Sequence, residues 1–249
     1  MGTEASGNWQ SVLVAGKLCD VFEPCTPGPY ALLHLHGVGM ETLAGNAVWT
    51  GLLEQNGLRA ICPHGKRSWW TNRICSEFDP QITAEKHVLQ NVLPFIAERW
   101  GVAPPKIGLC GISMGGQGAL RLALKYPSRF PVVAAISAAL DYQTLYGRGT
   151  TIDEMYDDKE SVRQDTATLH VHPLNWPRHM LFVIDPTDRD WFEGNRRLHE
   201  KLSALGIPHE YDFSTTAGGH SWDYFDHMAG RVIEFVCREL GAESLRISD

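Results

Sequence analysis

The stretch "KIGLCGISMGGQGALRLALKYP" (residues 106–127) decides how the rest of the chain is interpreted, because an apolar run passes through glycines directly into a helical pattern. Its centre reads Gly111-Ile-Ser113-Met-Gly115. A strand, this motif and then a helix form the context of a nucleophile elbow, a sharp turn that exposes a serine hydroxyl. Side chains at 111 and 115 would collide across such a turn, which explains the glycines. We therefore predict Ser113 as a nucleophile. The alternative is a serine that only caps an ordinary helix.

Apolar runs of the same kind alternate with helical patterns along the chain, as expected for strands buried on both faces of a parallel sheet. The predicted strands lie at 10–16, 17–24, 30–37, 58–65, 106–113, 131–137, 179–185 and, as an edge strand, 209–214. The predicted helices lie at 84–100, 191–205 and 222–240, besides the one after Ser113. Pro94 should interrupt the first of these. We predict an α/β fold with a doubly wound, mostly parallel sheet flanked by helices, and one domain over residues 1–249.

An inserted segment, residues 140–176, separates the sixth and seventh predicted strands and is long for a connection. Between 153 and 165 it carries six acidic residues against two basic ones. It could cover the carboxyl ends of the strands, where ligands bind in open α/β sheets. It could equally be a solvated helical excursion, and the sequence leaves both interpretations open.

The composition limits the classes of partner. The chain has 249 residues, a formal charge of −7 and a pI of about 5.9, which disfavours nucleic acid or an anionic membrane surface as partner. The N-terminus has no basic segment followed by an apolar core, so no secretory signal is expected. No apolar run approaches the length of a membrane span. We expect a cytoplasmic protein.

A serine nucleophile needs a base, and His220 is the best placed of the eleven histidines. It follows Gly218-Gly219 between the edge strand and the last helix, and it comes late, as the order nucleophile, acid, histidine requires. The acid should follow the strand at 179–185. We choose Asp188, which lies in the turn, with Asp185 as second choice.

The remaining parts of a site are an oxyanion hole and a substrate wall. The backbone N–H groups of Met114 and Val38 are our candidate oxyanion donors, with Gly39 as an alternative to Val38. Trp69, Trp70 and Trp222 are candidate substrate-binding residues. The alternative for these tryptophans is packing over the edge of the core.

Four segments together resemble the esterase D-like (putative esterase) branch of the α/β-hydrolase superfamily, over about residues 30 to 236. They are "HGVG", "GISMGGQGALRLALKYP", "DPTDRDWFEGNRRLHEKLSALGIPHEY" and "GGHSWDYF". The resemblance implies an α/β-hydrolase fold and a Ser-His-Asp hydrolase without metal or organic cofactor. Carried onto this chain, the triad is Ser113, Asp188 and His220, with Met114 and Val38 as oxyanion donors.

Two departures from the family pattern matter. Formylglutathione hydrolases carry a Ser-Gly-Leu-Thr-Cys-like segment where this chain has His-Gly-Val-Gly-Met (36–40), which disfavours a glutathione thioester as substrate. The family's Gly-x-x-Asp reads Asp185-Pro-Thr-Asp188 here, which keeps the acid and loses the glycine.

The leading hypothesis is a serine carboxylesterase that cleaves a small-molecule ester through an acyl-enzyme on Ser113. An acyltransferase and an S-formylglutathione-type thioesterase are alternatives on the same scaffold. A metal-dependent hydrolase using His34, His36, His170 and His172, and a non-catalytic binding protein, are alternatives from other classes. Whether the chain forms a homo-oligomer is left open by the sequence.

Overall fold

The computed structural model describes residues 7–248, so the first residues, on which the expectation of no secretory signal rests, lie outside the described part. The strands are β1 (Asn8–Val14), β2 (Lys17–Glu23), β3 (Ala31–Leu35), β4 (Arg59–Pro63), β5 (Ile107–Ile112), β6 (Val132–Ile136), β7 (His179–Val183) and β8 (Glu210–Asp212). The helices are α1 (Ala47–Gln55), α2 (Ala84–His87), α3 (Leu93–Trp100), α4 (Met114–Lys125), α5 (Ile152–Met155), α6 (Lys159–Gln164), α7 (Phe192–Ala204) and α8 (Trp222–Ser248). No helix within residues 7–248 is long and apolar enough to cross a membrane.

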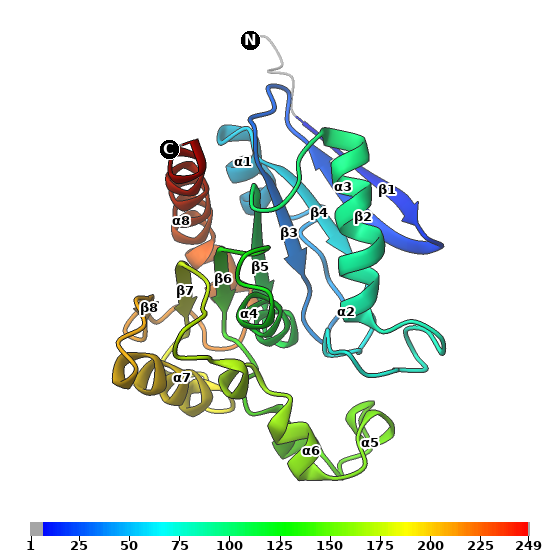
Figure 1. Cartoon of the computed structure of the whole chain (residues 1–249), viewed down its shortest axis with the longest axis vertical. Coiled ribbons are helices and arrows are strands. Elements are labelled where there is room, and N and C mark those ends of the chain that lie inside the picture. The colour runs from blue at the N-terminus through cyan, green and yellow to red at the C-terminus, as the bar shows by residue number, and fades with distance from the viewer. Residues whose placement is uncertain (1–6, 249) are drawn as a thin grey trace.

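All eight strands form a single sheet in the order β1-β2-β4-β3-β5-β6-β7-β8. β1 pairs antiparallel with β2, and β2 antiparallel with β4, whereas every pairing from β4 through to β8 is parallel. The predicted opening pair of strands and the mostly parallel sheet are thus confirmed. The parallel strands point toward one end of the molecule, the lower end in Figure 1.

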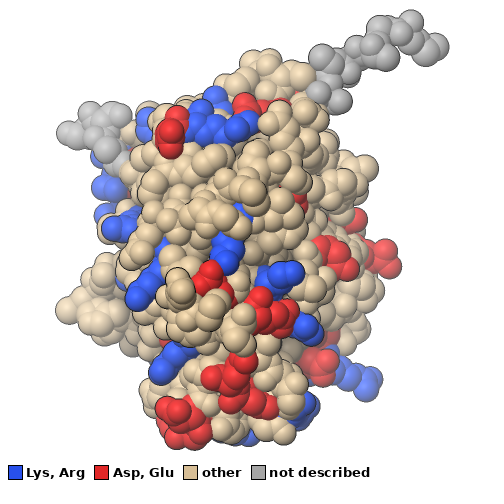
Figure 2. All heavy atoms as spheres, turned by 90° about the vertical axis from the view of Figure 1, so that its right-hand side faces the viewer, with Lys and Arg blue, Asp and Glu red and all other residues tan. Residues whose placement is uncertain are grey.

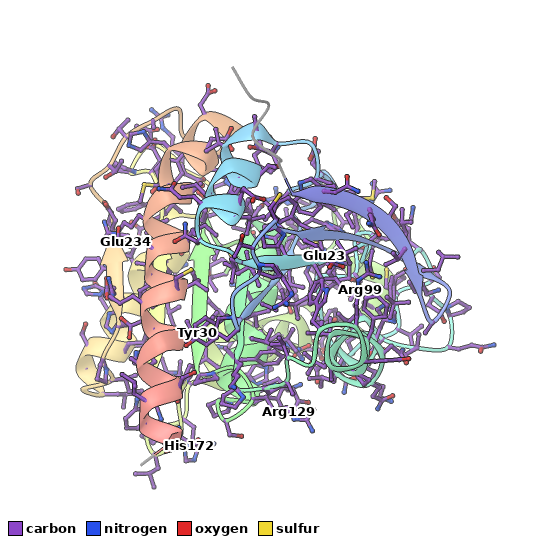
Figure 3. The ribbon with its side chains drawn as sticks, turned by 90° about the horizontal axis from the view of Figure 1, so that it is seen from above. Glu23, Tyr30, Arg99, Arg129, His172 and Glu234 are labelled. Carbon is purple, nitrogen blue, oxygen red and sulfur yellow. The ribbon has the colours of Figure 1, made fainter. Side chains whose placement is uncertain are left out.

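Helices cover both faces of this sheet, because the parallel strands carry apolar side chains on both sides. α1 and α8 pack on one face, and α3, α4 and α7 pack on the other. Figure 3 shows α8 and α3 on opposite sides of the strands and labels Glu23 of β2 beside Arg99 of α3. The Arg99 Nε donates to Glu23 Oε1 over 2.8 Å. The doubly wound arrangement therefore agrees with the sequence prediction.

Three helical predictions meet different outcomes. The pattern over 84–100 is interrupted as expected, since a π-helical turn at Val88–Val92 separates α2 from α3 and Pro94 sits in the first turn of α3. α7 agrees with the helix predicted at 191–205, and its Leu198 and Leu202 are buried. Leu205 follows Ala204, the last residue of α7, and is 42% exposed. The last helix continues beyond residue 240 to Ser248.

The inserted segment lies at the carboxyl end of the parallel strands and contains α5 and α6 (Figure 1). Figure 2 shows acidic side chains gathered at this lower end of the molecule. The segment is bonded to the loop after β4: Thr151 Oγ1 donates to the Arg67 carbonyl over 2.6 Å, and Ser76 Oγ donates to Glu154 over 2.7 Å. Of the two interpretations left open by the sequence, the structure supports a cover over the strand ends.

Candidate active site

The turn between β5 and α4 holds Ser113 in a left-handed backbone conformation, with φ 57° and ψ −118°. Few non-glycine residues adopt this conformation, and it costs about 1–3 kcal/mol. An added Cβ at Gly111 would overlap the Gly115 carbonyl, and one at Gly115 would overlap the Leu35 carbonyl of β3. Glycine is therefore required at both positions, as the sequence predicted. The Ser113 side chain ends up almost buried, with 6% of the residue exposed.

The loop before α8 brings His220 to this serine. Gly218 and Gly219 have φ values of 101° and 69°, which glycine adopts without strain. The His220 Nε2 lies 2.9 Å from Ser113 Oγ, and its Nδ1 lies 2.6 Å from Asp188 Oδ2. The Phe225 ring packs edge-on against the imidazole, with centroids 5.4 Å apart. The three side chains thus form a continuous hydrogen-bonded chain although 107 residues separate Ser113 from His220.

Asp185, the second choice for the acid, has different partners. Its carboxylate is buried and accepts from the Thr187 N–H and hydroxyl, each over 2.7 Å. It also accepts from the N–H groups of Ala217 and Gly219, over 2.7 and 2.9 Å. Burial by itself raises the pKa of Asp185, but the hydrogen bonds from Thr187, Ala217 and Gly219 outweigh it and bring the pKa down to about 2. This carboxylate therefore connects the turn after β7, which carries Asp188, to the loop before α8, which carries His220.

The segment after β3 passes directly over the serine. An added Cβ on Gly37 would lie 3.3 Å from Ser113 Cβ, so the backbone at 37–38 approaches the hydroxyl closely. Met114 follows Ser113 at the start of α4, where backbone N–H groups lack partners within the helix. The structure thus places both candidate oxyanion segments, those of Val38 and Met114, next to Ser113.

Two hollows meet at Val38. The histidine-side hollow, about 190 Å³, is lined by Gly37, Val38, Ser113, His220, Trp222 and Phe225. The Trp69 hollow, about 360 Å³, is lined by Val38, Arg67, Trp69, Glu77, Leu145 and Thr150. The inserted segment contributes Leu145 and Thr150, and the loop after β4 contributes Arg67, Trp69 and Glu77.

The three candidate tryptophans are placed differently. Trp222 lines the histidine-side hollow and Trp69 lines the hollow named after it. Trp70 lines neither of these two hollows. It is fully buried, its indole N–H donates to the His36 carbonyl over 3.1 Å, and an added Cβ on Gly118 would strike its ring. Trp70 therefore packs in the core and is not in a position to contact substrate in either hollow. Packing was the alternative that the sequence offered to a substrate-binding role.

The histidine pairs of the metal hypothesis do not converge. The His34 ring is buried near Trp49, and burial lowers its pKa to about 3. The His36 Nε2 instead accepts from the Gly65 N–H over 2.9 Å. His170 pairs with Asp165 over 3.1 Å. Within residues 7–248, no group of three His, Cys, Asp or Glu side chains is arranged to hold a metal ion.

Comparison with known proteins agrees with this geometry. The family model described as "Putative esterase" matches residues 75–228, which is more than half of the chain. The chain belongs to this family. Among curated family relatives, the chain is 26% identical to "Esterase MT1326" of Mycobacterium tuberculosis over 184 residues, covering 63% of this chain and 40% of that protein. It is 28% identical to "Acetyl esterase" of Caldicellulosiruptor saccharolyticus over 143 residues, covering 51% of this chain and 53% of that one.

Solved structures share the fold over nearly the whole chain. An S-formylglutathione hydrolase from Agrobacterium tumefaciens superposes with a TM-score of 0.77 at 15% identity, covering 96% of this chain and 98% of that one. The Staphylococcus aureus fluorophosphonate-binding serine hydrolase FphF gives a TM-score of 0.75 at 17% identity, covering 94% and 99%. At these identities the likeness establishes the α/β-hydrolase fold. The match to the curated esterases covers only about half of their length or less.

Several residues around the site escaped the sequence prediction. Leu145 and Thr150 line the Trp69 hollow from an insert whose path no pattern could give. Arg121 is buried and paired with Glu85 and with Asp165, which docks the insert on α4. A signal for Arg121 was present, since it stands among apolar residues in "GALRLALK". A charged residue on the buried face of a helix requires a buried partner.

Proposed function

We propose that this protein is a serine carboxylesterase that hydrolyses small-molecule esters through an acyl-enzyme on Ser113. The observation that carries the proposal is the unbroken contact from Ser113 Oγ to His220 Nε2 and from His220 Nδ1 to Asp188, over 2.9 and 2.6 Å. A serine hydroxyl is a weak nucleophile at neutral pH and becomes effective when an adjacent base takes its proton. Membership of the esterase family supports the same reaction class.

In the first half of the proposed reaction, Ser113 Oγ attacks the ester carbonyl while His220 Nε2 takes the hydroxyl proton. Asp188 accepts from His220 Nδ1, which fixes the tautomer with its free lone pair on Nε2 and stabilises the imidazolium. The carbonyl oxygen becomes an oxyanion, which the N–H groups of Met114 and Val38 stabilise. His220 then gives its proton to the alcohol oxygen as that bond breaks.

In the second half, water takes the place of the alcohol. His220 accepts a proton from the water, whose oxygen attacks the acyl carbon, and Ser113 leaves with a proton returned from the imidazolium. The same steps with an alcohol in place of water would make the protein an acyltransferase. We propose hydrolysis because the family model and both curated relatives carry the name esterase.

The test is the Ser113→Ala variant against p-nitrophenyl acetate, with Ser137→Ala as a matched control. Ser137 is also a buried serine with positive φ, 47°, directly after the neighbouring strand β6, and its hydroxyl has no hydrogen-bond partner among residues 7–248. Ser113→Ala should lower kcat by at least about ten-thousandfold with unchanged thermal unfolding, whereas Ser137→Ala should keep wild-type turnover. Wild-type activity in Ser113→Ala, or equal losses in both variants, would refute the nucleophile.

A further inference from the structure

The site fixes three of the four directions around the acyl carbon, if it reacts as proposed above. At the tetrahedral stage this carbon is bonded to Ser113 Oγ, to the oxyanion, to the leaving oxygen and to the acyl substituent. The oxyanion must face the N–H groups of Val38 and Met114. The leaving oxygen must face His220 Nε2, because that atom supplies its proton. The acyl substituent is left with the direction away from His220.

The Trp69 hollow adjoins the histidine-side hollow, because Val38 lines both of them. Of these two hollows only the histidine-side one is lined by His220, so the Trp69 hollow is the one that can take a substituent pointing away from His220. The leaving group then occupies the side lined by His220, Trp222 and Phe225. The acyl group enters the side lined by Trp69 and Leu145. At about 360 Å³, this side falls within the size range of small-molecule sites, far beyond what the methyl group of an acetyl ester needs.

The inner wall of the Trp69 hollow is held rigidly. Trp69 is 3% exposed, has a φ of 55°, and stacks on Tyr142 with ring centroids 4.8 Å apart and an interplanar angle of 14°. The Tyr142 hydroxyl lies 3.1 Å from that of Tyr156, which donates to Asp165 over 2.7 Å. Asp165 accepts in turn from Arg121 of α4 over 2.9 Å. A wall supported in this way stays in place when substrate binds. The volume of the hollow therefore limits the size of the acyl group that fits.

The far end of the hollow is polar. Arg67 Nε donates to both carboxylate oxygens of Glu77, over 3.1 and 3.0 Å, and both side chains are partly exposed. Glu77, Thr150 and Thr151 also line the open groove beyond the hollow, which places the polar residues on the side away from Ser113. The Thr150 hydroxyl is buried and has no hydrogen-bond partner in the described part of the chain. An acyl chain entering from the serine therefore meets apolar surface first and hydrogen-bonding groups last.

We propose that the Trp69 hollow is the acyl subsite and that the enzyme prefers medium-length acyl groups that end in a hydrogen-bonding group. Acetyl and formyl esters leave this hollow unfilled and are poor substrates. Each methylene that enters apolar surface contributes about 0.8 kcal/mol, or roughly fourfold in kcat/KM. The gain in kcat/KM with acyl length should end at the length at which the acyl chain reaches Arg67 and Glu77. At that length an acyl group with a terminal hydroxyl should again be a better substrate than one without it.

The experiment measures kcat/KM for p-nitrophenyl esters of acetic, butanoic, hexanoic and ω-hydroxyhexanoic acid, which share one leaving group. The wild type should prefer hexanoyl over acetyl by at least about tenfold, and ω-hydroxyhexanoyl over hexanoyl. Leu145→Trp, which fills the hollow, should lower the hexanoyl-to-acetyl ratio at least tenfold. Leu174→Trp is the matched control, because Leu174 is 85% exposed and lines neither hollow, and its ratio should stay that of the wild type.

The outcomes separate this inference from the proposed function. If every ester is turned over by a Ser113-dependent reaction but acyl length has no effect, the acyl subsite is refuted and the esterase stands. An unchanged ratio in Leu145→Trp refutes it as well. If no ester is hydrolysed at all, the proposed function fails first. Thr150→Tyr fills the same hollow from another position and replaces Leu145→Trp if thermal unfolding shows that variant to be misfolded.

Discussion

Two groups of hydrogen-bonded polar residues in this molecule are arranged in opposite ways. Around Ser113, His220 and Asp188 form an open line in which each group touches the next, and a third of the His220 side chain is exposed. Around Arg121, the guanidinium contacts Glu85 and Asp165, and only 2% of its side chain is exposed. Glu85 in turn accepts from Lys125 and Tyr126, so the second group is a closed network.

The difference teaches what each arrangement can do. In the first group, the hydrogen-bonded row of Asp188, His220 and Ser113 ends at a hydroxyl that can bond to the substrate. A proton can therefore pass from Ser113 to His220 as that bond forms. A closed network has every charge compensated and holds its elements together, here α4, the start of α2 and the inserted segment. Substitutions in the first group should therefore change rate, and substitutions in the second should change stability.

The largest expected effect is on the rate of Asp188→Asn. The amide keeps the shape of the carboxylate but can donate to His220 Nδ1, which selects the wrong tautomer and removes the charge that stabilises the imidazolium. We expect kcat for p-nitrophenyl acetate to fall about ten-thousandfold. The unfolding free energy should change by less than about 1 kcal/mol, measured by urea denaturation. If Asp188→Asn lost at least tenfold less rate than Asp185→Asn, the assignment of Asp188 as the triad acid would be wrong.

The second effect is on the stability of Arg121→Met. Removing the guanidinium leaves Glu85 and Asp165 without their buried counter-charge, which costs about 3–5 kcal/mol of unfolding free energy. Turnover of p-nitrophenyl acetate per folded molecule should stay within about tenfold of wild type. Urea denaturation followed by tryptophan fluorescence measures the first quantity. Wild-type stability in this variant would show that the network contributes nothing to docking the insert.

The smallest effect is the pH dependence of stability that Asp185 contributes. Its pKa is about 2 in the folded protein and 3.8 ordinarily, so the stabilisation is complete above 3.8 and is lost as the pH falls through 2. The difference corresponds to about 2 kcal/mol. The melting temperature of Asp185→Asn should lie below that of wild type at pH 6, and the gap should narrow between pH 4 and pH 2. If the difference in melting temperature between wild type and Asp185→Asn stayed constant across this range, the titration of Asp185 would not contribute to the pH dependence of stability.

The sequence was most informative where the structure depends on neighbouring residues. The strand, the glycines and the helix around Ser113 are set by local sterics, so the elbow could be predicted from the motif. The glycines before His220 similarly indicated a loop that reaches over the sheet. The mostly parallel pairing also followed from the alternation of apolar runs with helical patterns, whereas the order of the strands was not predicted.

The sequence could not separate alternatives where the partners are distant in the chain. Asp185 and Asp188 stand three residues apart and are chemically identical, and only the positions of Ala217, Gly219 and His220 distinguish their environments. The adjacent Trp69 and Trp70 share a φ of 55°, yet Trp69 lines a hollow and Trp70 is fully buried in the core. Such differences depend on tertiary contacts that no local pattern contains.

The tight fit of Gly115 against the Leu35 carbonyl has a consequence for protein engineering. Because neither Gly111 nor Gly115 has room even for a methyl group, mutagenesis libraries that vary these two positions should consist almost entirely of inactive variants. The loop after β4 and the insert supply most of the lining of the Trp69 hollow, and none of its lining residues lies within 111–115. A laboratory that wishes to change the proposed acyl preference should therefore randomise Leu145 and Thr150 and leave Gly111 and Gly115 unchanged.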